Sequence, residues 1–132
     1  MGAEPKILVV DDDEELLETV SVLLSASGYH TYTSDSRESG VKQAVEVLPD
    51  LVILDVMMET DDAGLLFLED IRKVDALRHT PVIVLSAVHP LARARFTDMA
   101  RWQGLSVREF REKPVAMDVL LASVRAALGK QG

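Results

Sequence analysis

The sequence predicts an α/β protein, a doubly wound (βα)5 three-layer sandwich whose parallel five-stranded sheet has the order 2-1-3-4-5. Five short apolar runs alternate with stretches in which apolar residues recur every three or four positions, the spacing of an amphipathic helix. The strongest runs are apolar throughout, which is typical of strands buried on both faces of a parallel sheet. Right-handed connections then give a flavodoxin-like fold, in which ligands bind beside the ends of the first and third strands.

The expected strands are short, and helical stretches separate them. They comprise residues 6–10, 29–33, 51–54, 81–85 and 107–111. Pro81 stands at the first position of the fourth strand, where proline is tolerated. The fifth run is apolar only at Val107 and Phe110, so its pattern is the least regular of the five.

A helix is expected after each strand. The apolar spacing places these helices near residues 16–24, 41–48, 65–74, 91–102 and 119–128. Asp12 or Asp13 can cap the first helix, because a short acidic side chain accepts hydrogen bonds from the first turn. Gly28 and Gly129 follow the first and last helices in the usual C-terminal position, and Pro49 stops the second helix.

Length, charge and cysteine content narrow the function classes. The 132 residues predict a single domain, 1–132, with a core from about residue 6 to residue 128. A net charge of −8 disfavours direct binding of nucleic acid, whose phosphates are negative. The absence of cysteine excludes disulfides and thiolate chemistry. We find no apolar run of membrane-spanning length and no signal peptide, and therefore expect a soluble, cytoplasmic protein without a membrane partner.

Chemically active side chains follow four of the predicted strands. Asp11–Asp13 follow the first strand, Asp55 the third, Ser86 the fourth and Lys113 the fifth. Parallel strands end at the same edge of a sheet, so these groups are expected to face one small space. Clustered carboxylates repel one another unless a cation neutralises them, and ligands that are all oxygen suit Mg²⁺. The lysine and the hydroxyl remain as hydrogen-bond donors to an anion, which predicts a binding site for a phosphoryl group. One of the carboxylates can act as the nucleophile that accepts this group.

Four motifs at these strand ends carry a family resemblance. They are Ile7–Asp12, Pro49–Met58, Val82–Ala87 and Lys113-Pro114. In this order, over essentially the whole chain, they resemble the receiver domain of two-component response regulators, including the stand-alone chemotaxis regulators. Each motif alone is weak, whereas the four together at matching strand ends are specific.

The resemblance implies a role for each matching acidic position. Asp55 is expected to be the phosphoacceptor and a ligand of Mg²⁺. Asp12 is expected to be the direct Mg²⁺ ligand, and Asp11 the second acid, which reaches the metal mostly through water. Met57 would contribute only its backbone carbonyl to the metal.

The resemblance also implies a switch. Ser86 corresponds to the hydroxyl that turns inward to the phosphoryl oxygen, and Lys113 to the lysine that pairs with Asp55 or its phosphoryl group. The peptide bond between Lys113 and Pro114 is expected to be cis. Phe110, three positions before Lys113, stands at the place of the aromatic switch residue.

Some of these residues have a purely structural explanation when taken singly. Phe110 can be a core residue, Asp55 a turn residue and Ser86 a helix cap. Trp102 can cover the end of the fourth helix or anchor a partner. The constellation, rather than any one member, carries the functional interpretation.

Two stretches depart from the pattern of the family. In the loop Glu59–Gly64, Glu59 replaces the usual proline, and the usual glycine falls one position late. The acids of this loop can attract the metal or simply be solvated, and the sequence leaves both alternatives open. Residues 102–109 lack the usual glycine-alanine turn.

Two positions near the expected phosphoryl group, Met57 and Val88, carry apolar side chains. Neither side chain can orient a hydrolytic water by hydrogen bonding, which predicts slow loss of the phosphoryl group.

The first interpretation is a phosphorylation-dependent signalling switch, a regulator that assists its own phosphotransfer and dephosphorylation rather than an enzyme. A sensor histidine kinase or phosphotransfer protein would phosphorylate Asp55. The face formed by the fourth helix, fifth strand and fifth helix would then signal to a downstream protein or form a homodimer. The chain ends just after the fifth helix, so a stand-alone receiver is expected, with a receiver fragment of a longer regulator as the alternative.

Two other interpretations compete with this one. A receiver-like binding module that needs no phosphorylation is favoured by the altered loop and disfavoured by the intact acids, Ser86 and Lys113. A metal-dependent phosphohydrolase would carry a second aspartate two positions after the nucleophile, where this chain has Met57. Mg²⁺-dependent phosphorylation of Asp55 distinguishes the switch from the binding module.

Overall fold

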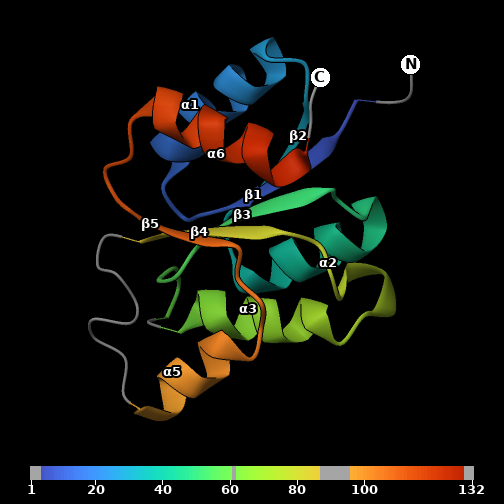
Figure 1. Ribbon diagram of the computed structural model, residues 1–132, viewed down its shortest axis with the longest axis vertical. Coiled ribbons are helices and arrows are strands. Elements are labelled where there is room, and N and C mark those ends of the chain that lie inside the picture. Colours follow the sequence, from blue (N-terminus) through green and yellow to red (C-terminus); the bar gives the residue numbers. More distant parts are fainter. Residues whose placement is uncertain (1–3, 61, 87–95, 130–132) are drawn as a thin grey trace.

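The computed structural model describes residues 4–60, 62–86 and 96–129. Five parallel strands form a sheet of order β2-β1-β3-β4-β5, which confirms the predicted topology (Figure 1). The strands are β1 (Lys6–Val10), β2 (His30–Ser34), β3 (Leu51–Asp55), β4 (Val82–Ser86) and β5 (Glu109–Glu112). Because β1 pairs directly with β3, the carboxyl ends of these two strands lie beside each other.

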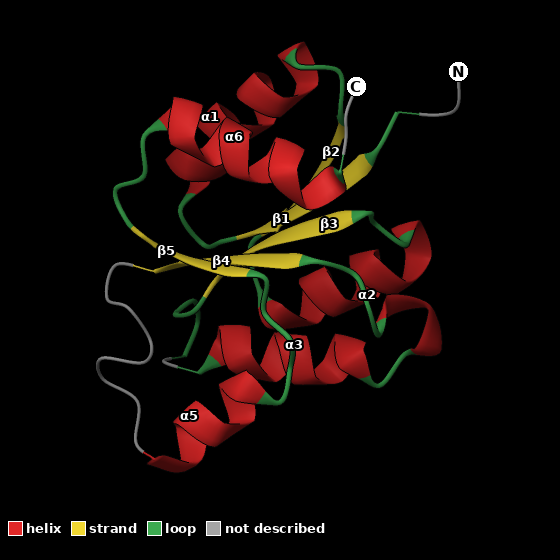
Figure 2. Ribbon diagram, in the orientation of Figure 1, coloured by secondary structure: helices red, strands yellow, loops and turns green. Residues whose placement is uncertain are grey.

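Helices cover both faces of the sheet, as Figure 2 shows. They are α1 (Glu14–Ala26), α2 (Arg37–Val47), α3 (Ala63–Arg72), α5 (Phe96–Gln103) and α6 (Met117–Leu128), with a short 3-10 turn at Asp75–Leu77. α1 and α6 lie on one face, and α2, α3 and α5 lie on the other. None of the described helices combines the length and the apolar character that crossing a membrane requires.

The central strands pack into two cores with alternate side chains. One core, against α1 and α6, takes from these strands Ile7, Val9, Leu51, Ile53, Ile83 and Leu85. The other core, against α2, α3 and α5, takes Leu8, Val10, Val52, Leu54, Val82 and Val84. β3 and β4 are buried from end to end and β1 nearly so, whereas the edge strands β2 and β5 are only partly buried. This difference explains why the central strands appear in the sequence as continuous apolar runs.

The helix ends follow the predicted capping residues. The carboxylate of Asp13 accepts a hydrogen bond from the N–H of Leu16 at 3.2 Å and starts α1. Gly28 after α1 and Gly129 after α6 have φ angles of 96° and 74°, in the left-handed region that glycine favours. Leu48 at the end of α2 is also left-handed, with a φ angle of 54°.

Some element boundaries differ from the predicted ones, and two of these differences have a visible cause in the structure. α2 begins at Arg37 rather than near residue 41, because Ser36 caps the helix earlier by accepting a hydrogen bond from the N–H of Ser39. β5 begins at Glu109 rather than at residue 107, after a left-handed turn at residue 106 with a φ angle of 56°. α5 is described from residue 96 onward, and residues 91–95 of the predicted helix lie outside the described residues.

Candidate functional site

Three carboxylates meet where β1 and β3 end. Asp11 and Asp12 directly follow β1, and Asp55 is the last residue of β3. One carboxylate oxygen of each lies within 4.8 Å of the others. Asp11 and Asp55 are only 2% and 6% exposed, whereas Asp12 is exposed to solvent. The sheet topology thus brings together the three acids that the sequence predicted as metal ligands.

Lys113 places a positive charge among these carboxylates. Its Nζ donates a hydrogen bond to Asp11 at 2.8 Å and lies 3.5 Å from an oxygen of Asp55. Asp11 is therefore the closer partner, although the family resemblance implied a pair with Asp55. Burial alone would lower the pKa of Lys113, but the hydrogen bond with Asp11 and the charges of both acids outweigh it and leave this pKa raised. The ammonium group of Lys113 therefore offsets part of the repulsion between the carboxylates of Asp11 and Asp55.

The backbone at the end of β5 positions this lysine. The N–H of Lys113 donates to the carbonyl of Ser86 at 2.8 Å, which joins the ends of β5 and β4. The peptide bond between Lys113 and Pro114 is cis, as expected. The hydrogen bond to Ser86 places the start of the lysine side chain at the same sheet edge as Asp55.

The pKa of Asp55 is raised from its ordinary value of 3.8 to about 7. Burial is the largest cause, and the negative charge of Asp11 adds to it, whereas the charge of Lys113 opposes the rise. Three carboxylates against one ammonium leave surplus negative charge, which favours binding of a divalent cation. The donor atoms are all oxygen, so the residues present fit Mg²⁺ rather than a softer metal.

Two residues predicted as switch elements lie on strands next to this cluster. Ser86 is buried at the end of β4, and Asp55 pairs with Leu85 in the same ladder. Phe110 on β5 packs into the core on the side of α2, α3 and α5. Its ring meets Trp102 edge-on, with 5.6 Å between centroids and an interplanar angle of 74°. Trp102 is only 4% exposed, so it is a core residue, and its interpretation as an exposed partner anchor is wrong.

The loop after Asp55 is held close to the strand it leaves. The N–H of Gly64 donates to the carbonyl of Val56 at 2.8 Å. A Cβ atom at Gly64 would lie 2.2 Å from the carbonyl oxygen of Asp55, so only glycine fits there. Met57 is 50% exposed, so its side chain does little to hold its backbone in place. The position of that backbone depends on contacts of the neighbouring residues.

Two contacts of the surrounding helices had no signal in the sequence. The carboxylate of Glu59 accepts a hydrogen bond from the N–H of Arg37 at 3.0 Å. Arg101 on α5 donates to both oxygens of Glu69 on α3, at 2.8 and 2.6 Å, and lowers the pKa of that acid. The partners lie 22 and 32 positions apart in the chain, and single charged residues carry no spacing pattern that would pair them.

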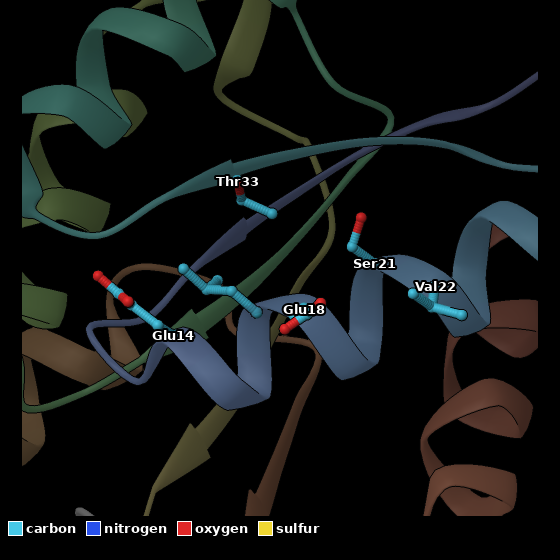
Figure 3. Close-up of a pocket in the computed structure, with 6 residues that line it drawn as sticks. Glu14, Glu18, Ser21, Val22 and Thr33 are labelled. Carbon is cyan, nitrogen blue, oxygen red and sulfur yellow. The ribbon is translucent and has the colours of Figure 1, made fainter.

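An open surface pocket of about 320 Å³ lies between α1 and β2 (Figure 3). Its lining consists of Glu14, Leu17, Glu18, Ser21, Val22 and Thr33. None of the predicted site residues contributes to this lining, so the candidate functional site is the acidic cluster rather than this pocket. Ala87, Val88 and His89, which follow β4, lie outside the described residues.

Comparisons with known proteins identify one family of relatives. A family model described as the response regulator receiver domain matches residues 7–125. The chain is 30% identical over 130 residues to the transcriptional regulatory protein PrrA of Mycobacterium leprae, covering 98% of this chain and 52% of that protein. It is 29% identical over 124 residues to the DNA-binding dual master transcriptional regulator RpaA of Synechocystis, covering 94% of this chain and 49% of that protein.

The chain spans about half the length of the curated relatives it matches. Among solved structures, the chemotaxis protein CheY4 of Vibrio cholerae is similar with a TM-score of 0.82. The match covers 96% of this chain and 100% of that chain at 23% identity, which shows a shared fold.

Proposed function

Because the chain belongs to the response regulator receiver domain family, we propose that it is a phosphorylation-dependent signalling switch of a two-component system. A sensor histidine kinase or a phosphotransfer protein would donate a phosphoryl group to Asp55. The observation that carries this proposal is the cluster of Asp11, Asp12 and Asp55, with the ammonium group of Lys113 beside Asp11 and Asp55. A nucleophile, oxygen ligands for a metal and a fixed cation occupy one edge of the sheet.

Asp55 is the acid that we propose as nucleophile. It ends a buried central strand, so its backbone is fixed by pairing with β4. In the transfer, an oxygen of Asp55 forms a bond to phosphorus while the bond between phosphorus and the donor nitrogen breaks. The electron pair leaves with that nitrogen, which solvent protonates, and the product is an acyl phosphate.

The residues around Asp55 would supply the charge that this step needs. Asp55 attacks only when ionised, and its raised pKa of about 7 shows that Lys113 alone does not secure the ionised form. Mg²⁺ held by Asp11, Asp12, Asp55 and the backbone carbonyl of Met57 would neutralise the carboxylates and the charge of the transferred group. The Lys113 ammonium, 3.5 Å from Asp55, is placed to attract the phosphoryl oxygens.

Ser86 and Phe110 are proposed to convert the new phosphoryl group into a change of surface. The hydroxyl of Ser86 would turn to a phosphoryl oxygen, and the ring of Phe110 would move inward behind it. Because Trp102 packs edge-on against Phe110, a movement of one ring changes the packing of the other. The change would spread over α5, β5 and α6, where a downstream protein or a second copy of the chain would bind.

We place one receiver domain over residues 1–132, with its core at about 6–128. Its matched relatives are about twice as long and are named as transcriptional regulators. A stand-alone receiver and the receiver part of a longer regulator are therefore both candidates for the context of this domain. The net charge of −8 argues against direct contact between this domain and nucleic acid.

A phosphorylation-independent binding module with the receiver fold is the second candidate function. The loop Glu59–Gly64, which departs from the family pattern, is the observation that favours it. The cluster of the buried acids Asp11 and Asp55 with the partly buried Lys113 argues against it, because burying carboxylates is costly and a module without phosphoryl chemistry has no use for them.

Locating the phosphoryl group distinguishes the two candidates. The chain is incubated with acetyl phosphate and MgCl₂, and the acyl phosphate is then reduced with borohydride, which converts an aspartyl phosphate to homoserine. We expect fragment masses to place homoserine at Asp55 and to leave Asp11 and Asp12 unchanged. Modification at Asp11 or Asp12 would refute Asp55 as the nucleophile, and no modification with either acetyl phosphate or a phosphorylated phosphotransfer protein would favour the binding module.

A further inference from the structure

The carboxylate of Glu59 links the loop after β3 to the start of α2. Its two oxygens lie 3.0 and 3.3 Å from the backbone nitrogen of Arg37, the first residue of α2, and accept its N–H. The helix itself leaves this N–H unpaired, and the positive end of the helix dipole favours an anion there. The hydroxyl of the capping residue Ser36 accepts from a different N–H, that of Ser39, so Glu59 supplies a second and separate cap.

The side chain of Arg37 joins the same region to α3. Its Nε donates to the carboxylate of Asp70 at 2.8 Å. This hydrogen bond is the largest cause of the raised pKa of Arg37, to which the charges of Asp62 and Glu59 also contribute. Arg37 thus binds Glu59 of the loop through its backbone and α3 through its side chain.

The backbone around Met57 is fixed on each side. The N–H of Gly64 holds the carbonyl of Val56 at 2.8 Å, and the N–H of Met58 donates to the carbonyl of Thr60 at 3.1 Å. Met57 lies between these two hydrogen bonds, and its own exposed side chain provides little anchoring. The position of the Met57 carbonyl therefore depends on contacts made by the following residues of the loop.

We propose that Glu59 is a positioning residue of the metal site. By attaching the loop to α2, it presents the Met57 carbonyl to Mg²⁺ together with the carboxylates of Asp12 and Asp55. Mg²⁺ demands a nearly ideal octahedral arrangement, so a ligand that is already in place avoids the cost of ordering the loop on binding. This inference rests on the proposed function, because it presumes that the acidic cluster binds Mg²⁺.

Two substitutions separate this role from a simple effect of negative charge. Glu59→Gln removes the charge but keeps an oxygen that accepts from the N–H of Arg37. Glu59→Asp keeps the charge but is one methylene shorter and loses that reach. Asp62→Asn is the matched control, because it removes the same charge from the same loop and keeps the acceptor oxygen for the hydroxyl of Thr60, 2.9 Å away.

The test measures the dissociation constant for MgCl₂ by titration calorimetry on the metal-free full chain, with thermal unfolding as a check that each variant folds. We expect Glu59→Asp to weaken Mg²⁺ binding about tenfold, and Glu59→Gln and Asp62→Asn to change it less than about twofold. If instead Gln and Asn weaken binding while Asp does not, the loop acts through charge alone and the proposal is overturned.

The remaining outcomes are also decisive. Unchanged affinity in all three variants would show that the contact of Glu59 with Arg37 caps α2 without affecting the metal site, which overturns the positioning role while leaving the proposed function intact. Failure of the unaltered chain to bind Mg²⁺ would overturn both.

Discussion

Replacing Asp55 by asparagine is expected to stabilise the metal-free fold at alkaline pH. The pKa of this carboxyl rises from 3.8 in its ordinary environment to about 7 in the fold, because it is buried and faces Asp11. A shift of about 3 units corresponds to about 4 kcal/mol of unfavourable free energy when the group is forced to ionise. Water and counter-ions that reach the exposed Asp12 screen part of this cost, so we expect Asp55→Asn to gain about 2 kcal/mol at pH 8.

The pH dependence fixes the sign of this effect. A raised pKa means that the unfolded chain ionises first, so the native chain loses stability as the pH rises from about 4 to about 7. Below about pH 4 the carboxyl is protonated in both states, and the advantage of asparagine disappears. The gain of the variant over the unaltered chain should therefore grow between about pH 4 and about pH 7 and then level off.

Urea unfolding with EDTA at pH 5 and pH 8 measures this difference. With a typical slope for a chain of this size, 2 kcal/mol moves the midpoint by about 1 M urea. Asp35→Asn, which removes an exposed carboxylate, is the control for net charge. Adding MgCl₂ should stabilise the unaltered chain more than Asp55→Asn. A midpoint at pH 8 that is no higher in Asp55→Asn than in Asp35→Asn would refute the reasoning.

Three further substitutions test other parts of the structure. Gly64→Ala should destabilise the fold by about 3 kcal/mol or prevent folding, because its Cβ would lie 2.2 Å from the carbonyl oxygen of Asp55; an unchanged urea midpoint would contradict this. Arg72→Met should cost about 2–4 kcal/mol in the same assay, since four backbone carbonyls lose a charged donor, and a loss below about 1 kcal/mol would count against it. Met57→Asn should speed loss of the phosphoryl group several-fold, because an amide can orient a hydrolytic water and a thioether cannot; mass spectrometry of the decay should show no change if this idea is wrong.

The fold could be predicted from the sequence largely because its central strands are buried on both faces. Residues 7–10, 51–54 and 82–85 are buried and have no side that faces solvent, so they appear in the sequence as continuous apolar runs. The edge strand β5 is half-exposed, and its predicted start at residue 107 was wrong by two positions. The strands were predicted well where they are buried on both faces, and the strand propensity of the individual residues mattered less.

The grouping of the candidate site followed from topology, whereas its supporting contacts did not. Once parallel strands were predicted, Asp11, Asp55 and Lys113 had to end at one edge, and they do. The hydrogen bond between Glu59 and α2 and the ring contact of Trp102 depend on how helices pack on the sheet. A pattern along one chain carries no information about such packing, which only the structure supplies.

Intact mass after phosphorylation tests the central claim most directly. The chain, Asp55→Asn and the chain with EDTA are each incubated with acetyl phosphate, and the chain is also tested with a phosphorylated phosphotransfer protein. We predict the gain of one phosphoryl group by the unaltered chain with Mg²⁺, and no gain by Asp55→Asn or in EDTA. A gain that persists in Asp55→Asn, or no gain from either donor in the presence of Mg²⁺, would contradict a switch built on Asp55.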